Sequence, residues 1–270
     1  MFIDTHCHLN MIVKEQPDKF LDENHFLMIS NVIKEAREKD VGKIITIGTS
    51  VIESINSVEI AKRFDEVFAA VGIHPCDCKE DWRSDFERIK DLVKEKKKNN
   101  IIAIGETGLD FFHRPFHKQR QFDAFRTHID LAIEHDLPLV MHVRHAADEV
   151  LTILQEYTNI VNVRGVMHSF LQDKDFANTI LKWGMYFGIG ATITYPKNND
   201  LRDLVSKLPL EKILLETDAP FLPPQQLRGK KNLPSYIPIF SKTVAELKNI
   251  DISLLEKVTT DNATRLFSLL

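Results

Sequence analysis

The sequence has few of the features that would set it apart from an ordinary globular protein. Its three cysteines, Cys7, Cys76 and Cys78, are too few for a disulfide framework and indicate a reducing compartment. Cys76 and Cys78 are separated by a single residue, closer than the usual zinc-binding pair. No apolar run is long enough to span a bilayer, and the N-terminal residues lack the pattern of a signal peptide. We therefore expect a cytoplasmic protein without a membrane partner.

The chain also lacks an excess of positive charge. Its 35 Lys and Arg residues face 39 Asp and Glu residues, which gives a net charge of −4. Such a chain has no overall attraction to nucleic acid, so any contact with a polyanion must come from a local basic patch. A hydrophobic content of 43% and a charged content of 27% are typical of a globular protein.

Short β-branched runs alternate along the chain with segments whose apolar residues recur at helical spacing. We expect strands at residues 1–9, 43–48, 67–73, 101–105, 137–141, 160–167, 185–191 and 212–216. We expect helices at residues 26–39, 53–64, 84–98, 117–135, 145–157, 173–182, 199–208, 237–248 and 252–267, with a polar connection containing Pro17 at residues 10–25.

Strict alternation of strands and helices indicates a parallel sheet. Eight such units predict an α/β fold in the form of a closed (β/α)8 TIM barrel, a single domain over residues 1–270. An open doubly wound sheet is the alternative. It is disfavoured because the glycine-rich phosphate-binding pattern expected after its first strand is absent.

Polar residues of one chemical kind recur where the expected strands end. The first strand, FIDTHCHL, directs Asp4, His6 and His8 to one face, because side chains alternate along a strand. Residues at or just past strand ends include His6, His8, His74, Glu106, His142, His168 and Asp218. In a (β/α)8 barrel these ends meet at one mouth, where the chemistry takes place. A lone histidine is usually a hydrogen-bonded core residue, but a set from several strands is not explained in that way.

The donors in this set are nitrogen and oxygen atoms, which suit Zn²⁺, Mn²⁺ or Mg²⁺. The metal-binding candidates are His6, His8, Glu106, His142, His168 and Asp218. These are too many ligands for one tetrahedral ion that keeps an open position. They suit two divalent ions that share a carboxylate, about 4 Å apart.

Motifs along the whole chain resemble those of one known family. They are FIDTHCHL (2–9), VGIHP (71–75), IGETGLDF (104–111), MHVRHA (141–146), VMHSF (166–170), LLETDAPFLPP (214–224), RGKKNLP (228–234) and DNATRLF (261–267). Together they resemble the TatD family of metal-dependent deoxyribonucleases, within the amidohydrolase-like metal hydrolases. Two positions depart from the pattern, Gln172 in place of a frequent Gly and Asp261 in place of a more usual Glu. Neither is a proposed ligand.

The resemblance implies a role for each polar residue at the mouth. His6, His8 and Asp218 would hold the first ion, His142 and His168 the second, and Glu106 would bridge the two. His74 would lie beside the ions and contact the scissile phosphate. Asp218 is the best candidate to take the proton of the attacking water. Glu216 is expected to support a ligand from behind.

The substrate-binding candidates are basic and aromatic. Arg144 shares the inward direction of His142 and is expected to pair with phosphate or with Glu216. Arg228, Lys230 and Lys231 would follow a polynucleotide backbone, and Arg228 and Lys230 fall in a family motif. Arg114 and Lys197 are weaker candidates for this role. Phenylalanines 111, 112 and 221 are candidates for base stacking, and we expect at least one of them to serve packing instead.

The sequence therefore predicts a metal-dependent phosphodiesterase acting on DNA, a 3′–5′ exonuclease that prefers single strands and works as a monomer. The alternative is an ester or amide hydrolase such as a D-aminoacyl-tRNA deacylase, in which the same activated water attacks a carbonyl. A non-enzymatic scaffold predicts eroded ligands, and all six are present.

Overall fold

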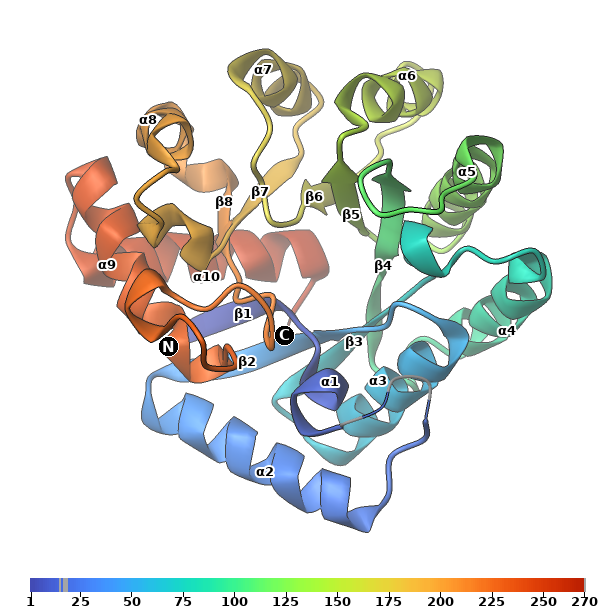
Figure 1. Cartoon of the computed structure of the whole chain (residues 1–270), viewed down its shortest axis with the longest axis horizontal. Coiled ribbons are helices and arrows are strands. Elements are labelled where there is room, and N and C mark those ends of the chain that lie inside the picture. The colour runs from blue at the N-terminus through green and yellow to red at the C-terminus, as the bar shows by residue number, and fades with distance from the viewer. Residues whose placement is uncertain (15, 17–18, 270) are drawn as a thin grey trace.

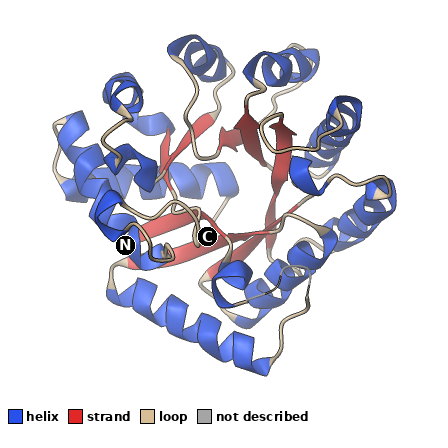
Figure 2. Cartoon of the chain, viewed as in Figure 1, coloured by secondary structure: helices blue, strands red, loops and turns tan. Residues whose placement is uncertain are grey.

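Eight parallel strands pair in chain order around the centre of the molecule and are surrounded by helices (Figures 1 and 2). The computed structural model describes residues 1–14, 16 and 19–269. The strands are β1 (Phe2–Cys7), β2 (Val41–Ile47), β3 (Val67–Val71), β4 (Ile101–Asp110), β5 (Leu139–Arg144), β6 (Gly165–Met167), β7 (Tyr186–Ile189) and β8 (Ile213–Leu215). The (β/α)8 barrel predicted from the sequence is confirmed.

The helices follow the strands and form the outer layer of the barrel (Figure 2). They are α1 (Leu9–Val13), α2 (Glu23–Glu38), α3 (Val51–Arg63), α4 (Trp82–Lys94), α5 (Lys118–Glu134), α6 (Ala147–Thr158), α7 (Lys174–Lys182), α8 (Asn199–Lys207), α9 (Ile237–Lys248) and α10 (Ile252–Phe267). Short 3₁₀ turns are η1 (Pro75–Asp77), η2 (Ala191–Thr194), η3 (Leu210–Lys212), η4 (Gln225–Leu227) and η5 (Pro234–Tyr236).

The barrel closes where the end of β1 meets the segment that follows β8. The amide of His8 donates to the carbonyl of Ala219 at 2.7 Å, and the amide of Asp218 donates to the carbonyl of His6 at 2.8 Å. Below them, the buried carboxylate of Asp4 accepts hydrogen bonds from the backbone amide and the hydroxyl of Thr217, at 3.0 and 2.6 Å. Closure therefore fixes three ligand candidates, His6, His8 and Asp218, relative to one another.

The inside of the barrel is apolar at one end and polar at the other. Small and β-branched residues from successive strands fill the apolar end, and the last turns of α10 cover it. These inward residues include Ile3, Ile45, Ile47, Ala70, Ala103, Val140, Val166 and Leu214. A larger cluster packs the outer faces of the strands against the helices. Because the apolar end, the floor of the barrel, excludes water, polar side chains inside the barrel gather at the opposite end. That end is formed by the carboxyl ends of the strands.

Several expected boundaries differ from the structure. The fourth strand was expected to stop at Gly105, but β4 continues through Glu106 to Asp110. The sixth strand was expected at 160–167, but only Gly165–Met167 is extended, and Ile160 is 81% exposed in a turn. Helix α4 ends at Lys94, so the lysines at 96–98 lie in turns and not in its last turn. Pro17 lies outside the described residues.

No helix in the described part of the chain combines the length and the apolar content that a bilayer crossing requires.

A buried histidine in α5 ties that helix to the end of β3. His128 accepts a hydrogen bond at Nε2 from the amide of Ile73, at 3.0 Å, and its Nδ1 donates to the carbonyl of Ala124 at 2.7 Å. Burial lowers the pKa of His128 to about 4. The imidazole is therefore neutral in the native protein, whereas it takes up a proton near pH 6.5 in the unfolded chain.

We predict that this histidine makes stability depend on pH. Because the native pKa of His128 is depressed, its contribution is complete above pH 6.5 and is lost as pH falls towards 4. The loss between pH 7 and pH 5 is about 2 kcal/mol. The control is His128→Gln, which keeps a donor and an acceptor but does not titrate. In urea unfolding, the variant should have a lower free energy of unfolding than wild type at pH 7. This difference should be smaller at pH 5. Parallel pH dependences of the two proteins would contradict the prediction.

Candidate metal centre

Glu106 lies at the centre of the mouth because β4 is irregular at this point. The pairing of β4 with β5 shifts between Ile104 and Thr107, so Glu106 sits in a bulge. Bulges redirect side chains and are frequent beside active sites. The amide of Glu106 donates to the carbonyl of Gly48 at 3.0 Å, and the side chain is 4% exposed. Its two carboxylate oxygens face two separate groups of side chains.

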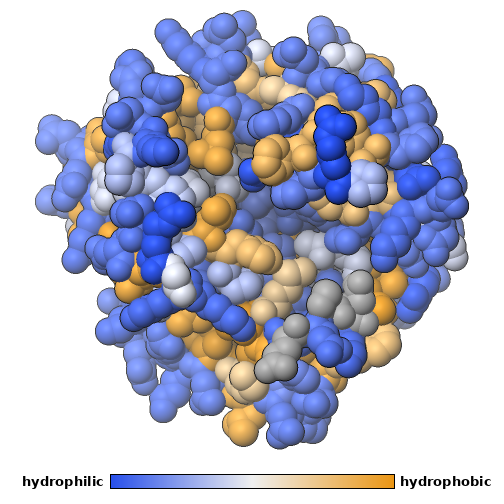
Figure 3. Space-filling model, viewed as in Figure 1, coloured by the Kyte–Doolittle hydropathy of each residue, from blue (hydrophilic) through white to orange (hydrophobic). Residues whose placement is uncertain are grey.

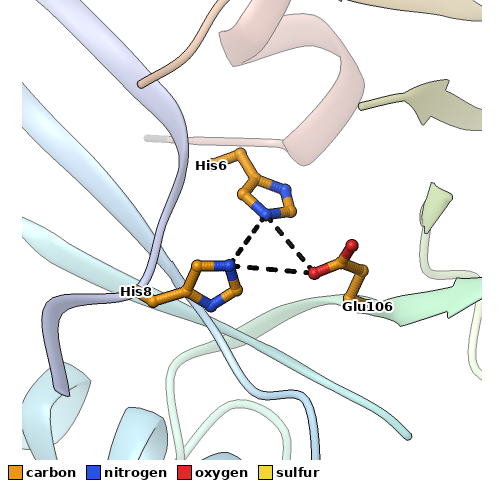
Figure 4. A group of neighbouring side chains, drawn as sticks. All are labelled: His6, His8 and Glu106. Atoms are coloured by element: carbon orange, nitrogen blue, oxygen red, sulfur yellow. Dashed lines mark hydrogen bonds and ion pairs between the residues drawn. The ribbon is translucent and has the colours of Figure 1, made fainter. Parts of the chain in front are cut away.

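The first group surrounds Glu106 Oε2 (Figure 4). His6 Nε2 and His8 Nε2 are 3.3 Å apart, and they lie 3.5 and 3.8 Å from this oxygen. Asp218 Oδ1 lies 3.6 Å from His6 Nε2 and 3.4 Å from His8 Nε2. Four ligands held at about 2.1 Å by a tetrahedral ion are about 3.4 Å apart, so these spacings match those of ligands around one ion.

The second group surrounds Glu106 Oε1. His142 Nδ1 lies 3.1 Å and His168 Nε2 lies 3.0 Å from this oxygen, and the two nitrogens are 3.4 Å apart. The rings of His6 and His168 stack with centroids 3.9 Å apart, which brings the two groups side by side. The structure thus brings together all six candidate ligands.

The outward nitrogens of three of the four imidazoles face oxygen acceptors. His8 Nδ1 donates to the carbonyl of Ile47 at 3.1 Å, and His142 Nε2 donates to Asp110 Oδ2 at 3.0 Å. His168 Nδ1 lies 3.4 Å from Glu216 Oε1. Such partners orient the rings, so that a bound metal would take the inward nitrogen and the ring proton the outward one. The donor types and their spacing therefore fit divalent cations on both sides of Glu106.

In His74 the proton lies on the nitrogen that faces the mouth, and the outward nitrogen is an acceptor. Its Nδ1 accepts a hydrogen bond from the amide of Cys76 at 3.1 Å, so the proton of the neutral ring is on Nε2. That nitrogen lies 3.6 Å from Glu106 Oε1. Burial lowers the pKa of His74 to about 3. A neutral imidazole with its N–H directed into the mouth is a hydrogen-bond donor and not a metal ligand.

The neighbouring imidazoles determine the ionisation of the carboxyl groups of Glu106 and Asp218. Burial opposes ionisation of Glu106, but the imidazole of His168 and a hydrogen bond from His142 help to outweigh it, and the pKa of Glu106 is lowered well below its usual value. Burial also opposes ionisation of Asp218, whose pKa is lowered because a hydrogen bond from His8 and the nearby imidazoles prevail. Both carboxylates are therefore ionised at neutral pH, as ligands of a cation must be.

Three supporting residues were not identified from the sequence. Asp110 accepts a hydrogen bond from His142 and so holds that ring. Burial opposes ionisation of Asp110, but hydrogen bonds from His142 and His113 outweigh it and lower the pKa of Asp110. Asp110 belongs to the motif IGETGLDF. Its inward position was not predicted because the strand was expected to end at Gly105. Asn232 donates to the carbonyl of Thr217 at 2.7 Å and holds the segment that carries Asp218. The role of Asp4 in fixing Thr217 was missed as well.

Glu216 lies behind His168, as expected for a supporting carboxylate. Its Oε1 accepts from the amide of Ser169 and faces His168 Nδ1. The expected alternative pairing of Arg144 with Glu216 is not found, because Arg144 instead lies over the ring of Phe112, with its Cζ 4.3 Å from the ring centroid. Arg144 is therefore exposed and free of acidic partners among the described residues.

A pocket of about 550 Å³ opens beside the cluster. Its lining includes the ligand candidates His142, His168 and Asp218 together with Arg144, Gln172, Tyr195 and Asn198. In the space-filling view the middle of this face is recessed, and hydrophobic residues gather around the recess among hydrophilic ones (Figure 3). The pocket therefore combines ligand-type side chains with a cationic and aromatic wall.

The other candidate substrate residues are spread more widely. Arg228 is exposed, with its Cζ 5.1 Å from the ring centroid of Tyr195, so it lies beside the pocket wall. Lys230 is exposed and does not line the pocket. Phe112 and Phe221 are 47% and 50% exposed, whereas Phe111 is buried against Phe116. One of the three phenylalanines thus serves packing.

Comparison with known proteins identifies the family. Residues 3–268 match the family described as TatD related DNase, so the chain belongs to the TatD family. It is similar to uncharacterized metal-dependent hydrolases of Buchnera aphidicola and Bacillus subtilis (YabD), each 35% identical over 99% of both chains. The crystal structure of YjjV, a TatD homolog from Escherichia coli, superposes with a TM-score of 0.89 and 27% identity over 100% of this chain and 98% of that one. The protein is a metal-dependent hydrolase of the TatD type.

Gly188 in β7 provides a test of the support behind His168. A Cβ atom at this position would overlap the carboxylate of Glu216, so only glycine leaves room for it. We predict that Gly188→Ala displaces Glu216 and lowers the affinity for Zn²⁺ beside His168 about 10- to 100-fold, measured by calorimetric titration of metal-free protein. The control is Gly42→Ala, whose Cβ would meet only the side chain of Met1. Unchanged affinity in Gly188→Ala would contradict the prediction.

Proposed function

We propose that the protein hydrolyses phosphodiester bonds in DNA as a 3′–5′ exonuclease that prefers single strands. The observation that carries the proposal is the division of the ligands between the two oxygens of Glu106. His6, His8 and Asp218 gather at Oε2, and His142 and His168 gather at Oε1. Two divalent cations held in this way would neutralise the phosphodiester and lower the pKa of the attacking water from about 15.7 towards about 7. The nitrogen-rich ligand set favours Zn²⁺ or Mn²⁺ over Mg²⁺.

Asp218 acts as the proton acceptor in this proposal. Its carboxylate is ionised and 15% exposed, so it reaches the pocket while it remains beside His6 and His8. Closure of the barrel fixes its backbone through the hydrogen bond from its amide to His6. A carboxylate fixed in this way is positioned to take the proton of the attacking water.

His74 orients the scissile phosphate. Its neutral imidazole presents the Nε2 proton to the mouth, and the amide of Cys76 holds the ring in that form. A donor at this point binds a phosphate oxygen without repelling the neighbouring cations, which a protonated imidazole would do.

Arg144 and the exposed aromatic rings bind the strand. Arg144 lies in the pocket wall without an acidic partner among the described residues, so its guanidinium is available to a phosphate. Phe112 and Phe221 are about half exposed, although Arg144 covers one face of Phe112, and bases stack on such rings only where the strand is single. Arg228 and Lys230 would follow the backbone beyond the pocket. These features support a single-stranded substrate.

We further propose that the protein works as a monomer in the cytoplasm. Its three cysteines are free, which supports a reducing compartment. All candidate ligands come from one chain, so a second copy is not needed to complete the site.

We predict that the two carboxylate ligands, Glu106 and Asp218, are essential for hydrolysis. Glu106→Gln should lower the rate on single-stranded DNA at least about 10³-fold, because the charge that both cations share is removed. Asp218→Asn should lower it about 10²- to 10⁴-fold, because the proton acceptor is lost. The assay uses 5′-labelled single-stranded DNA with Mg²⁺, Mn²⁺ or Zn²⁺ in turn.

The matched controls are Glu211→Gln and Asp261→Asn, which change exposed carboxylates and should leave the rate unchanged. If the wild-type protein hydrolyses single-stranded DNA no faster than Glu106→Gln and Asp218→Asn, the proposal is wrong. The same proteins are assayed on D-aminoacyl-tRNA. Deacylation that exceeds DNA hydrolysis and depends on Glu106 would replace the nuclease by the alternative ester hydrolase.

Arg144 should affect substrate binding more than the chemical step. We predict that Arg144→Met raises the KM for single-stranded DNA about tenfold, leaves kcat within about twofold, and reduces the slope of log affinity against log salt by roughly 0.7. Arg114→Met is the control, because Arg114 lies over Phe116 outside the pocket. Equal effects of the two substitutions would contradict a phosphate contact at Arg144.

A further inference from the structure

A second cluster of ligand-type side chains lies beside the metal centre. Cys76 belongs to η1, Asp110 ends β4, and His113 lies in the loop that follows. One ligand atom from each residue lies within 4.8 Å of the other two, and His113 Nδ1 is 2.8 Å from Asp110 Oδ2. A thiolate, an imidazole and a carboxylate form a ligand set typical of Zn²⁺.

The cluster is anchored on one side and open on the other. Asp110 is fully buried, and its Oδ1 accepts from the amides of Phe112 and His113, at 2.9 and 2.8 Å, so its carboxylate is fixed. Cys76 and His113 are exposed, so solvent reaches the cluster. Three protein ligands on a fixed base leave the fourth position of a tetrahedral ion to water.

The spacing of the cysteines does not reveal this cluster, because Cys76 finds its partners in another segment of the chain. Cys78, its neighbour in sequence, is buried and directs its Sγ to the carbonyl of Arg120, at 3.7 Å. It therefore contributes no ligand and serves as a matched control.

We propose that Cys76, Asp110 and His113 form an accessory site for a thiophilic divalent cation, Zn²⁺, distinct from the centre around Glu106. Binding releases the proton of the Cys76 thiol to solvent and places the ring proton of His113 on Nε2, so that Cys76 Sγ, His113 Nδ1 and an oxygen of Asp110 coordinate the ion. The site is a property of this ligand set and does not depend on the substrate of the enzyme.

Two contacts connect the accessory site to the main centre. Asp110 Oδ2 also accepts from His142 Nε2, and the amide of Cys76 donates to Nδ1 of His74. An ion on Cys76 and Asp110 therefore links the turn that holds His74 to the carboxylate that holds His142. The accessory ion shares Asp110 with a ligand of the main centre, so occupancy of one site affects the other.

Cobalt substitution tests the proposal without an activity assay. Co²⁺ bound to a thiolate gives a near-ultraviolet charge-transfer band, and the main centre contains no cysteine ligand. Metal-free protein, kept reduced with a phosphine, is titrated with Co²⁺ until the spectrum is constant. Wild type and Cys78→Ser should develop the band, and Cys76→Ser should not. His113→Asn should bind the thiolate-ligated Co²⁺ at least tenfold more weakly. Wild type reloaded with Zn²⁺ should hold an additional equivalent of zinc compared with Cys76→Ser.

Each contrary result overturns the assignment. Absence of the band in wild type removes the site, and a band that persists in Cys76→Ser assigns the thiolate to another cysteine. Unchanged Co²⁺ affinity in His113→Asn removes the imidazole from the site. Because Cys76 and His113 are exposed, their variants are expected to fold, and thermal unfolding curves that coincide with wild type establish this.

Discussion

The shared carboxylate of Glu106 is the interaction on which the site depends. A buried carboxylate is costly unless its charge is compensated, and Glu106 is compensated on both oxygens by ligand-type side chains. The bulge in β4 turns the side chain inward, and the closure of β1 on the segment after β8 brings His6 and His8 to one of its oxygens. Loss of this carboxylate would leave two groups of imidazoles without a common partner.

One end of the barrel interior stabilises the fold, and the other end carries the ligand-type side chains. Its floor is filled by aliphatic residues that exclude water, and α10 covers that end. Its mouth gathers imidazoles and carboxylates that contact one another around Glu106. Side chains behind them, such as Asp110 and Glu216, hold the imidazole rings and set which nitrogen carries the proton. His74 differs from these histidines because its Nδ1 accepts from the amide of Cys76, which leaves the ring proton on Nε2.

Much of this arrangement follows from local patterns in the sequence. Alternating apolar periodicities predicted the barrel, and polar residues at the ends of apolar runs predicted the residues that meet at its mouth. What the sequence did not predict depends on contacts between distant segments. Examples are the bulge at Glu106, the hydrogen bond from Asn232 to Thr217 and the meeting of Cys76 with Asp110. The long β4 was missed because its glycines resemble the end of a strand.

Anomalous diffraction from crystals of metal-replenished protein, collected at the absorption edge of the metal, tests the central claim most directly. The account predicts two peaks about 4 Å apart, one beside each carboxylate oxygen of Glu106. A single peak away from Glu106, or no peak within reach of its carboxylate, would contradict the account.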